Sequence, residues 1–495
     1  MHAITTLLLT PTKLIDDIPA DQTDDLNRNL KAIIEQDATL RAVAATPVGR
    51  SLAPKDKHSV CATVSIITSL SADDLSARLR RVGNGYPYRY TSKFHGVTPL
   101  YEDQNGAEAD AIAVPGLGSH ALGSWKSPNS DDVWLRDFLP KDVPNIRVLL
   151  YGYDTVLPGD LSKQSIENLG GALLEHIITF RTKDRTSHRP ITFISHSLGG
   201  LLIKVVRCPA TVRKQGTDYP TYGLLFFSVP NLGLRNDQLR TLIRGQPNEA
   251  LINDLLVDND SEPSAFLTRL ADQFSESCKG HYQVVTFFER MLSPTLESTT
   301  STGLVAMADE DNIALNTNHS GLVKYDSSNQ GDYTIVRERL SRLVAESKQE
   351  VAKRFAEHKI TQACMRSLAF EDMDGRANDI GEAADGTCKW LLKHNNLIQW
   401  TRQHRGLLWI KGKPGSGKST MMKYALRELP ALCGADTQAF AFFHGRGHEL
   451  QSTPLGLFRS LLHQLLSRIP GALRDLVDDF DAKRKSMGEP GEKRQ

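Results

Sequence analysis

The sequence predicts an α/β fold, and three observations support this prediction. Short apolar runs alternate with helical stretches along most of the chain, which is the order of elements in a doubly wound sheet. The runs are continuously apolar, as expected of strands that are covered on both faces. Two glycine-bearing turns, near residues 197 and 415, each lie between such a run and a helical stretch. We therefore expect mostly parallel sheets with sites at their carboxyl edges.

Length and composition exclude several classes of protein. The chain has 495 residues, which at roughly 150 residues per domain suggests about three units. Lysine plus arginine number 59 against 58 aspartate plus glutamate, so there is no basic field to bind nucleic acid. No apolar run approaches the ~18 residues of a transmembrane segment. Scattered cysteines without a C-x-x-C pair, and an acidic N-terminal stretch unlike a targeting peptide, predict a cytoplasmic protein.

The first part of the chain carries most of the sheet signals. Residues 1–55 form a polar segment, in which apolar spacing predicts one amphipathic helix over 24–43. Residues 56–345 are expected to form the main α/β domain. Its strands are predicted at 60–67, 111–114, 146–151, 191–194, 223–229 and 282–288, and its helices at 73–81, 165–180 and 198–206. A charged stretch over 332–359 predicts a solvated connecting helix.

The last part of the chain shows the same pattern on a smaller scale. A helical linker, residues 346–404, precedes the N-terminal part of a second α/β domain, residues 405–495. This domain is predicted to contain a strand at 407–410, a glycine loop, a helix at 419–429, a strand at 438–443 and a helix at 455–468.

The glycine loop fits the phosphate-loop pattern G-x-x-x-x-G-K-[ST], in the strand–loop–helix context that its mechanism requires. Backbone N–H groups would bind phosphate oxygens at the positive end of the helix. Lys418 would contact the β- and γ-phosphates, and the Ser419 hydroxyl would ligate Mg²⁺. A plain glycine turn is the alternative. We expect ATP or GTP with Mg²⁺ to bind through Gly412, Gly415, Ser416, Gly417, Lys418, Ser419 and Thr420.

Nucleotide hydrolysis needs a further part, an acidic residue that ends an apolar strand and serves Mg²⁺ and water. No such strand follows Phe443 in the sequence. Asp478, Asp479 and Asp481 sit in a charged helical context, which predicts a solvated face. We therefore expect little NTPase activity.

The run Ile191 to Gly200 reads as strand, sharp turn and helix, and nearly matches the nucleophile-elbow pattern G-x-S-x-G. Ser197 occupies the serine position and Gly199 the second glycine, while Ser195 replaces the first. A helix N-cap serine is the alternative interpretation. We favour the nucleophile, because its Oγ would stand at the carboxyl edge of the sheet and two further parts of such a site are present.

The first of these parts is an oxyanion hole, which stabilises the negative charge that develops during acyl transfer. The glycine-rich turn Pro115 to His120 directly follows an apolar strand, where one of its two N–H groups should lie. We expect the N–H of Leu198 to pair with that of Leu117 or Gly116.

The second part is a late histidine, because elbow enzymes order their triad as serine, acid and histidine. His319 lies in a polar loop ahead of the charged helix, and Glu289 ends the strand before it. Asp309 and Asp311 are alternative acids. His196, beside the nucleophile, is expected to be an elbow residue and not the base.

Motifs within residues 63–344 resemble the lipase-like family that includes the DUF676 and SERAC1 proteins. They are Thr98-Pro99-Leu100-Tyr101, Gly116-Leu117-Gly118, Tyr151-Gly152-Tyr153-Asp154, His196-Ser197-Leu198-Gly199-Gly200 and Asn318-His319-Ser320. Motifs at 366–370, 387–392 and 408–420 resemble the start of a nephrocystin-3-type NACHT unit. The combination is similar to fungal STAND (NLR-like) proteins.

This resemblance implies an α/β-hydrolase domain joined to a partial nucleotide-binding NACHT domain, through which the chain would form a homo-oligomer. The sequence departs from the family at Pro115 and Ser195, where the family has histidine and glycine, and at Val229-Pro230-Asn231, where it has Thr-Pro-His. Family members continue into the acidic Mg²⁺ strand and a repeat array, so we expect a truncated chain.

These observations predict a serine ester hydrolase of the lipase or esterase type. Ser197 would be the nucleophile, His319 the general base and Glu289 the acid that orients it. Its substrate would be an ester or lipid, it would need no cofactor, and it would be the effector of the nucleotide-binding module. The alternative is an inactive hydrolase-fold scaffold in an ATP- or GTP-gated protein of innate immunity or heterokaryon incompatibility.

Overall fold

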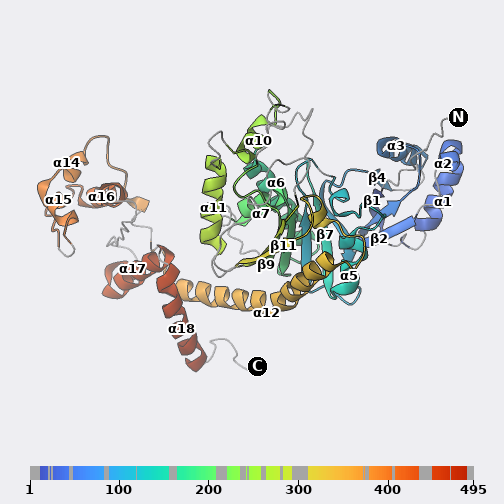
Figure 1. The fold of residues 1–495 in the computed structure, drawn as a ribbon. Helices are drawn as coiled ribbons and strands as arrows, with labels where there is room; N and C mark the ends of the chain where they lie inside the picture. Colours follow the sequence, from blue (N-terminus) through green and yellow to red (C-terminus); the bar gives the residue numbers. More distant parts are fainter. Residues whose placement is uncertain are drawn as a thin grey trace. The chain divides into compact units, whose positions relative to one another are not determined.

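The computed structural model describes residues 12–20, 23, 26–43, 48–82, 88–118, 120–154, 164–207, 220–234, 241, 245–257, 263–278, 282–291, 310–371, 373, 378–403, 407–433, 449–468 and 470–487. Figure 1 shows the helices and strands along the chain. The chain forms two compact units, Met1–Ala352 and Lys353–Gln495. The boundary between them falls inside one helix, α12 (Gly331–Leu368).

The first unit begins with a small antiparallel sheet in the order β2-β3-β1-β4. Its strands are β1 (Thr12–Pro19), β2 (Val48–Pro54), β3 (Ser59–Ser65) and β4 (Arg89–Thr91). The sequence pattern assigns the run at 60–67 to the main domain, but β3 instead pairs with two strands from the N-terminal segment. This pairing joins residues that are distant in the chain, so no local pattern indicates it.

Two helices occupy the stretch for which one is predicted. They are α1 (Leu26–Gln36) and α2 (Ala38–Val43). Asp37 separates them, because its Oδ1 accepts hydrogen bonds from the N–H groups of Thr39 and Leu40 at 2.8 and 2.9 Å and so caps α2. Together with α3 (Ala72–Val82), they bury apolar side chains against the small sheet.

A seven-stranded sheet forms the centre of the first unit, in the order β11-β10-β9-β8-β6-β7-β5. Its strands are β5 (Gly96–Glu102), β6 (Ala109–Val114), β7 (Ile146–Gly152), β8 (Ile191–His196), β9 (Thr221–Phe227), β10 (Gln283–Glu289) and β11 (Glu310–Leu315). Neighbouring strands are parallel, except that β5 runs antiparallel to β7. The strands β6 to β10 match predicted runs, which confirms the mostly parallel α/β sheet, whereas the two outer strands are not in the prediction.

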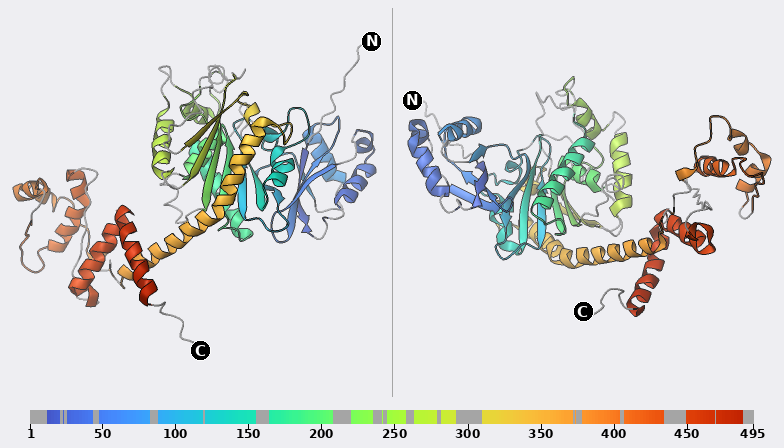
Figure 2. Two further views of the ribbon diagram at one scale, coloured as in Figure 1. Left: turned by 60° about the horizontal axis from the view of Figure 1, so that its bottom comes forward. Right: turned by 180° about the vertical axis from the view of Figure 1, so that it is seen from behind.

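Helices cover both faces of the main sheet (Figure 2). Helices α6 (Ile166–Lys183), α7 (Leu198–Arg207), α10 (Glu249–Leu255) and α11 (Ala265–Cys278) share one apolar core with the sheet. Two short helices, α4 (Trp134–Asp137) and α5 (Leu139–Asp142), follow β6. Helix α12 packs against β9, where an added Cβ on Gly223 would lie 3.0 Å from Leu343 Cδ1. The strands are therefore covered on both faces, as their apolar sequences predict.

The helix predicted over 332–359 is present within α12, but only its end after Val351 is solvated. Its apolar stripe, at Val336, Leu340, Leu343, Val344 and Val351, is buried. Apolar residues at helical spacing mark the face that packs, and here that face meets the main sheet while the charged residues stay outside.

The described part of the second unit is helical. Its helices are α14 (Lys389–Leu392), α15 (Asn395–Thr401), α16 (Lys418–Cys433), α17 (Pro454–Arg468) and α18 (Pro470–Met487). Leu391, Leu397 and Ala425 form a small buried cluster, so part of the expected linker packs on the helix that follows the glycine loop. Asp478 and Asp479 are exposed and Asp481 pairs with Lys485, which confirms the solvated face.

The strand predicted at 407–410 is absent from the structure. The segment has no regular secondary structure, and Leu407 and Trp409 are 84% and 74% exposed. A strand needs a hydrogen-bonded neighbour, and the described residues of this unit contain none. The other predicted strand, at 438–443, lies outside the described residues. No helix in the described ranges has both the length and the hydrophobicity to cross a bilayer.

Candidate active site

Ser197 lies at the turn between β8 and α7, at the carboxyl edge of the main sheet. Its φ of 51° places it in the left-handed region, which residues with a Cβ rarely adopt. The turn is held by its neighbours, since the Ser197 N–H donates to the Phe227 carbonyl at 2.9 Å and its carbonyl accepts from the Gly200 N–H at 3.0 Å. This strained strand–turn–helix connection is the geometry of a nucleophile elbow.

The residues around the turn explain the glycine pattern. An added Cβ on Gly199 would lie 2.5 Å from the Val114 carbonyl oxygen, and one on Gly200 would lie 2.1 Å from Val229 Cγ2. Both positions therefore require glycine. Ser195 stands in for the first glycine of the pattern, and it is fully buried in β8 with its Oγ 3.4 Å from the Leu225 carbonyl. The serine is accommodated without opening the turn.

His319 and Glu289 lie together although thirty positions separate them in the chain. Glu289 is the last residue of β10, it is fully buried, and its Oε1 lies 3.2 Å from His319 Nδ1. Asp311, an alternative acid, is instead exposed and paired with Arg339 at 2.8 Å. Asp309 lies outside the described residues. Of the described candidates, Glu289 at the end of β10 is therefore the one in contact with His319.

The first unit has an α/β-hydrolase fold. Its mostly parallel sheet carries a serine in an elbow after β8, an acid at the end of β10 and a histidine after β11. This is the chain order serine, acid, histidine of that fold.

The electrostatics keep the acid charged. Burial raises the pKa of Glu289, but the nearby His319 and Ser228 side chains lower it further than burial raises it. The carboxylate is therefore ionised at neutral pH and can accept a hydrogen bond from the imidazole.

His196 is an elbow residue, as its position predicts, and it also anchors the histidine loop. Its Nε2 lies 3.0 Å from the His319 backbone carbonyl, and the two ring centroids are 4.6 Å apart. Burial and the neighbouring His319 hold the pKa of His196 well below its usual range. A neutral ring can donate from Nε2 to the carbonyl.

The glycine-rich turn after β6 lies directly against the elbow. An added Cβ on Gly116 would lie 3.0 Å from Ser197 Cβ, a tight contact that glycine avoids. The Tyr153 hydroxyl donates to the Pro115 carbonyl at 2.8 Å and ties the turn to the end of β7. Leu117 is half-buried and Leu198 is buried at the start of α7. Two of the predicted oxyanion-hole residues, Gly116 and Leu198, therefore lie beside the predicted nucleophile.

Ser228, which directly follows β9, is not among the predicted site residues. Its Oγ lies 3.1 Å from His319 Nδ1, and the residue is 3% exposed. The predicted strand at 223–229 runs through it, so the pattern treats it as one more buried strand position. A polar residue at the carboxyl end of a buried strand is the signal that could have found it.

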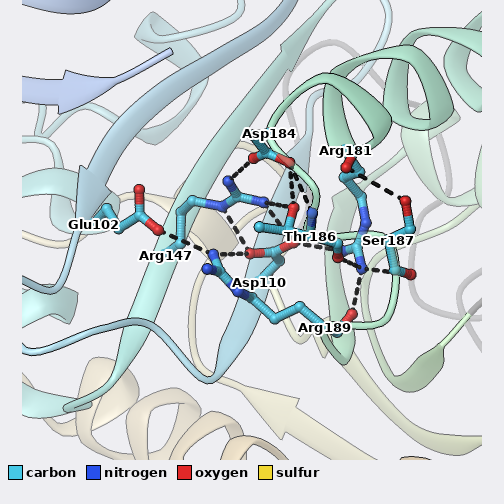
Figure 3. Close-up of polar contacts among 8 residues, drawn as sticks. All are labelled: Glu102, Asp110, Arg147, Arg181, Asp184, Thr186, Ser187 and Arg189. Carbon is cyan, nitrogen blue, oxygen red and sulfur yellow. Dashed lines mark hydrogen bonds and ion pairs between the residues drawn. The ribbon is translucent and has the colours of Figure 1, made fainter. Parts of the chain in front are cut away.

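A second polar cluster lies at the opposite edge of the sheet (Figure 3). Asp110, in the second position of β6, is fully buried and accepts hydrogen bonds from Arg147 at 2.8 and 2.9 Å. Arg181 and Arg189 also contact it, and Asp184 contacts Arg147. Three arginines face three carboxylates here, counting Glu102, which pairs with Arg189. The charges balance, so the cluster offers no unpaired charge to a ligand. Its ion pairs instead link strands, a helix and a loop.

The glycine loop of the second unit turns through two left-handed glycines just before a helix. Gly415 and Gly417 have φ angles of 79° and 76°, and α16, of 16 residues, begins at Lys418. An added Cβ on Gly412 would lie 2.5 Å from Ser416 Oγ. Lys418 Nζ donates to the carbonyls of Gly412 and Lys413 at 2.9 and 2.8 Å, so the amine already bridges the loop. These residues fit a phosphate group, which would take donors from the loop and the helix N-terminus.

Both parts of the chain are similar to known proteins. Residues 386–494, which include the glycine loop, match the family model described as Nephrocystin 3, N-terminal. The chain is 27% identical to protein SERAC1 of Homo sapiens over 226 residues, which are 41% of this chain and 33% of that protein. It is 27% identical to protein SERAC1 of Bos taurus over 228 residues, 41% of this chain and 34% of that protein. The chain thus spans about a third of the length of these relatives. The similarities confirm the resemblance of its motifs to SERAC1 proteins and to the N-terminal part of nephrocystin 3.

Solved structures with a similar arrangement include lipases. The lipase BlEst2 of Bacillus licheniformis is 13% identical and aligns over 50% of this chain and 97% of its own, with a TM-score of 0.34. A soluble variant of monoglyceride lipase from Saccharomyces cerevisiae is 12% identical over 51% of this chain and 90% of its own, with a TM-score of 0.33. The fold assignment itself rests on the strand order and the elbow.

Proposed function

We propose that the first unit is a serine ester hydrolase of the lipase or esterase type that works through an acyl-enzyme. The observation that carries the proposal is the position of His319. Its Nδ1 faces the buried, ionised Glu289, and its backbone carbonyl is bound by His196, the residue before Ser197. This arrangement supports a base that is oriented by an acid on one side and attached to the elbow on the other.

In the proposed reaction, Ser197 Oγ attacks the ester carbonyl carbon while its proton passes to Nε2 of His319. Glu289 stays ionised and stabilises the imidazolium that forms. The N–H groups of Leu198 and of Leu117 or Gly116 bind the carbonyl oxygen as it gains negative charge. The tetrahedral intermediate then expels the alcohol, which takes the proton from His319. A water molecule attacks the acyl-serine with the same base and releases the acid.

A fluorophosphonate probe tests the proposal on the full chain, because it labels only an activated serine. We expect labelling of the wild type and hydrolysis of a short p-nitrophenyl ester between about pH 6 and 9. Ser197→Ala and His319→Ala should each abolish both, and the double variant should be no worse than either one, because the residues act as a unit. Ser195→Gly, which restores the elbow glycine two positions away, is the matched control and should keep the activity.

The alternative, a catalytically inactive scaffold, predicts a different result. Folded wild-type protein would then show neither probe labelling nor ester hydrolysis at any pH in this range. Labelling that survives in Ser197→Ala would place the nucleophile elsewhere.

We propose for the second unit that it binds the phosphates of ATP or GTP and that the hydrolase is its effector. The support is the loop with two left-handed glycines ahead of α16, in a segment similar to the N-terminal part of nephrocystin 3. Ser419, one residue into this helix, would contribute its hydroxyl to the Mg²⁺ that accompanies the nucleotide. Assembly of several copies through this unit would follow nucleotide binding. Sedimentation of the full chain with and without ATP tests this step, and an unchanged mass would contradict it.

A further inference from the structure

We propose that Ser228 is a positioning residue of this site, whose hydroxyl shares the Nδ1 proton of His319 with Glu289 and so holds the imidazole toward the elbow. The inference rests on the proposed function, and nothing in the sequence motifs assigns this residue a role. It follows from the backbone, the burial and the contacts of one side chain.

The backbone at Ser228 repeats the backbone at Ser197. Each serine follows a strand of the main sheet, β9 and β8 respectively, and each has a left-handed φ, 43° and 51°. Each donates its N–H to the next strand of the sheet, Ser197 to Phe227 at 2.9 Å and Ser228 to Phe287 at 2.8 Å. The chain thus makes the same sharp turn after two neighbouring strands.

A side chain at position 228 costs backbone strain that a glycine would avoid. A left-handed φ strains any residue with a Cβ, and glycine would adopt it without strain. Among the described residues, positive φ without glycine occurs also at Asp17, Asn145 and Arg185, outside this edge of the sheet. At Ser228 the strained side chain is buried and its Oγ lies 3.1 Å from His319 Nδ1.

The contacts define what the hydroxyl does. His319 Nδ1 lies 3.1 Å from Ser228 Oγ and 3.2 Å from Glu289 Oε1, and because the carboxylate is ionised it accepts a proton that Nδ1 carries. Because Oγ accepts this proton, its own O–H is free to point to the carboxylate. Burial raises the pKa of Glu289, and the hydrogen bond from Ser228 is one of the contacts that lower it. Among the described groups, none bonds to Glu289 Oε2, and His319 and Ser228 are the side chains that lower the pKa of this carboxylate. The hydroxyl therefore favours the Nδ1–H tautomer, which leaves Nε2 as the proton acceptor.

The test separates the hydroxyl from the backbone with two variants of the full chain. Ser228→Ala removes the hydroxyl and keeps the strained Cβ, whereas Ser228→Gly removes both. If the hydroxyl positions His319, both variants should react with the fluorophosphonate about tenfold more slowly than the wild type, the effect of losing one hydrogen bond to a charged pair. Arg185→Gly is the matched control, because Arg185 has a similar φ of 63° but is exposed and distant from the site. It should react like the wild type.

A second measurement does not depend on activity. In ¹⁵N-histidine-labelled protein, the ring nitrogen shifts of His319, assigned with His319→Gln, report its tautomer. We expect the Nδ1–H form in the wild type and a mixture of tautomers in Ser228→Ala and Ser228→Gly. Wild-type reactivity in Ser228→Ala, or a tautomer that does not change in either variant, would overturn the inference. If the wild type is not labelled at all, the proposed function fails, and the NMR result still decides the role of Ser228.

Discussion

His196 and His319 are joined by two contacts, a hydrogen bond from the ring of His196 to the backbone carbonyl of His319 at 3.0 Å and a ring-to-ring contact at 4.6 Å. The residue before the proposed nucleophile therefore holds the loop that carries the proposed base. Because His196 is buried and its pKa is held well below the usual range, the ring that makes this link is neutral at neutral pH.

The neutral state of His196 predicts a dependence of stability on pH. The folded protein keeps the ring neutral, while the unfolded chain protonates it below its ordinary pKa of about 6.5. The unfolded state then binds more protons, so the free energy of unfolding should fall below this pH by up to about 1.4 kcal/mol per unit. His196→Asn should flatten this slope between about pH 5 and 6.5 in urea unfolding. The same change at the exposed His188 is the control, and an equal flattening there would contradict the assignment.

Two glycine substitutions should have opposite effects on stability. Gly200→Ala places a Cβ 2.1 Å from Val229 Cγ2, so we expect a loss of about 1–3 kcal/mol from overpacking between α7 and the end of β9. Gly171→Ala in α6 meets nothing within 4 Å and should add about 0.5–1 kcal/mol, because alanine is the better helix former. Melting temperatures measure both. A stable Gly200→Ala variant would mean that the elbow packs more loosely than the structure indicates.

Asp110→Asn should be among the most destabilising single changes in the first unit. Burial raises the pKa of Asp110, but Arg147 and Arg181 outweigh it, so the carboxylate is charged and compensates buried guanidinium groups. Removal of this charge should lower the free energy of unfolding by about 3–5 kcal/mol. Since the pKa of Asp110 is lowered by folding, this stabilisation is present at neutral pH and is lost as pH falls through the folded-state pKa, so the difference from wild type should narrow in acid.

The control for this change lies in the same cluster. Glu102→Gln removes a more accessible carboxylate that pairs only with Arg189 among the described contacts, and should cost less than about 1 kcal/mol. Urea unfolding curves of the three proteins give the comparison. Equal losses for both variants would show that burial does not set the strength of these pairs.

The nucleotide site predicts a difference between two lysines of one loop. Lys418→Ala should reduce binding of a fluorescent ATP analogue to the full chain at least about tenfold, because a charge-assisted contact to phosphate is lost. Lys413→Ala removes only the exposed side chain of another lysine in this loop. The backbone carbonyl of residue 413, which Lys418 contacts, remains. It should bind nearly as the wild type does. Fluorescence titration measures both, and equal binding by Lys418→Ala would remove the phosphate-loop assignment.

Several features followed from the sequence because their cause is local. Continuous apolar runs mark β6 to β10, since strands covered on both faces contain little else. Gly199 and Gly200 indicate a turn that packs closely, and the structure shows the atoms that exclude any Cβ there. Where the same local logic was applied to residues 407–410 it failed, because an apolar run becomes a strand only beside another strand.

The sequence by itself determined the α/β class of the main sheet and the position of the elbow at Ser197, since each depends on residues adjacent in the chain. Only the tertiary structure decided that β3 pairs with β1 and β2, that α12 is packed on the main sheet, and that Ser228 lies against His319. These relationships join segments far apart in sequence. Hydrogen bonds and close packing select such partners from the whole chain, and no residue carries a mark of which distant partner it will meet.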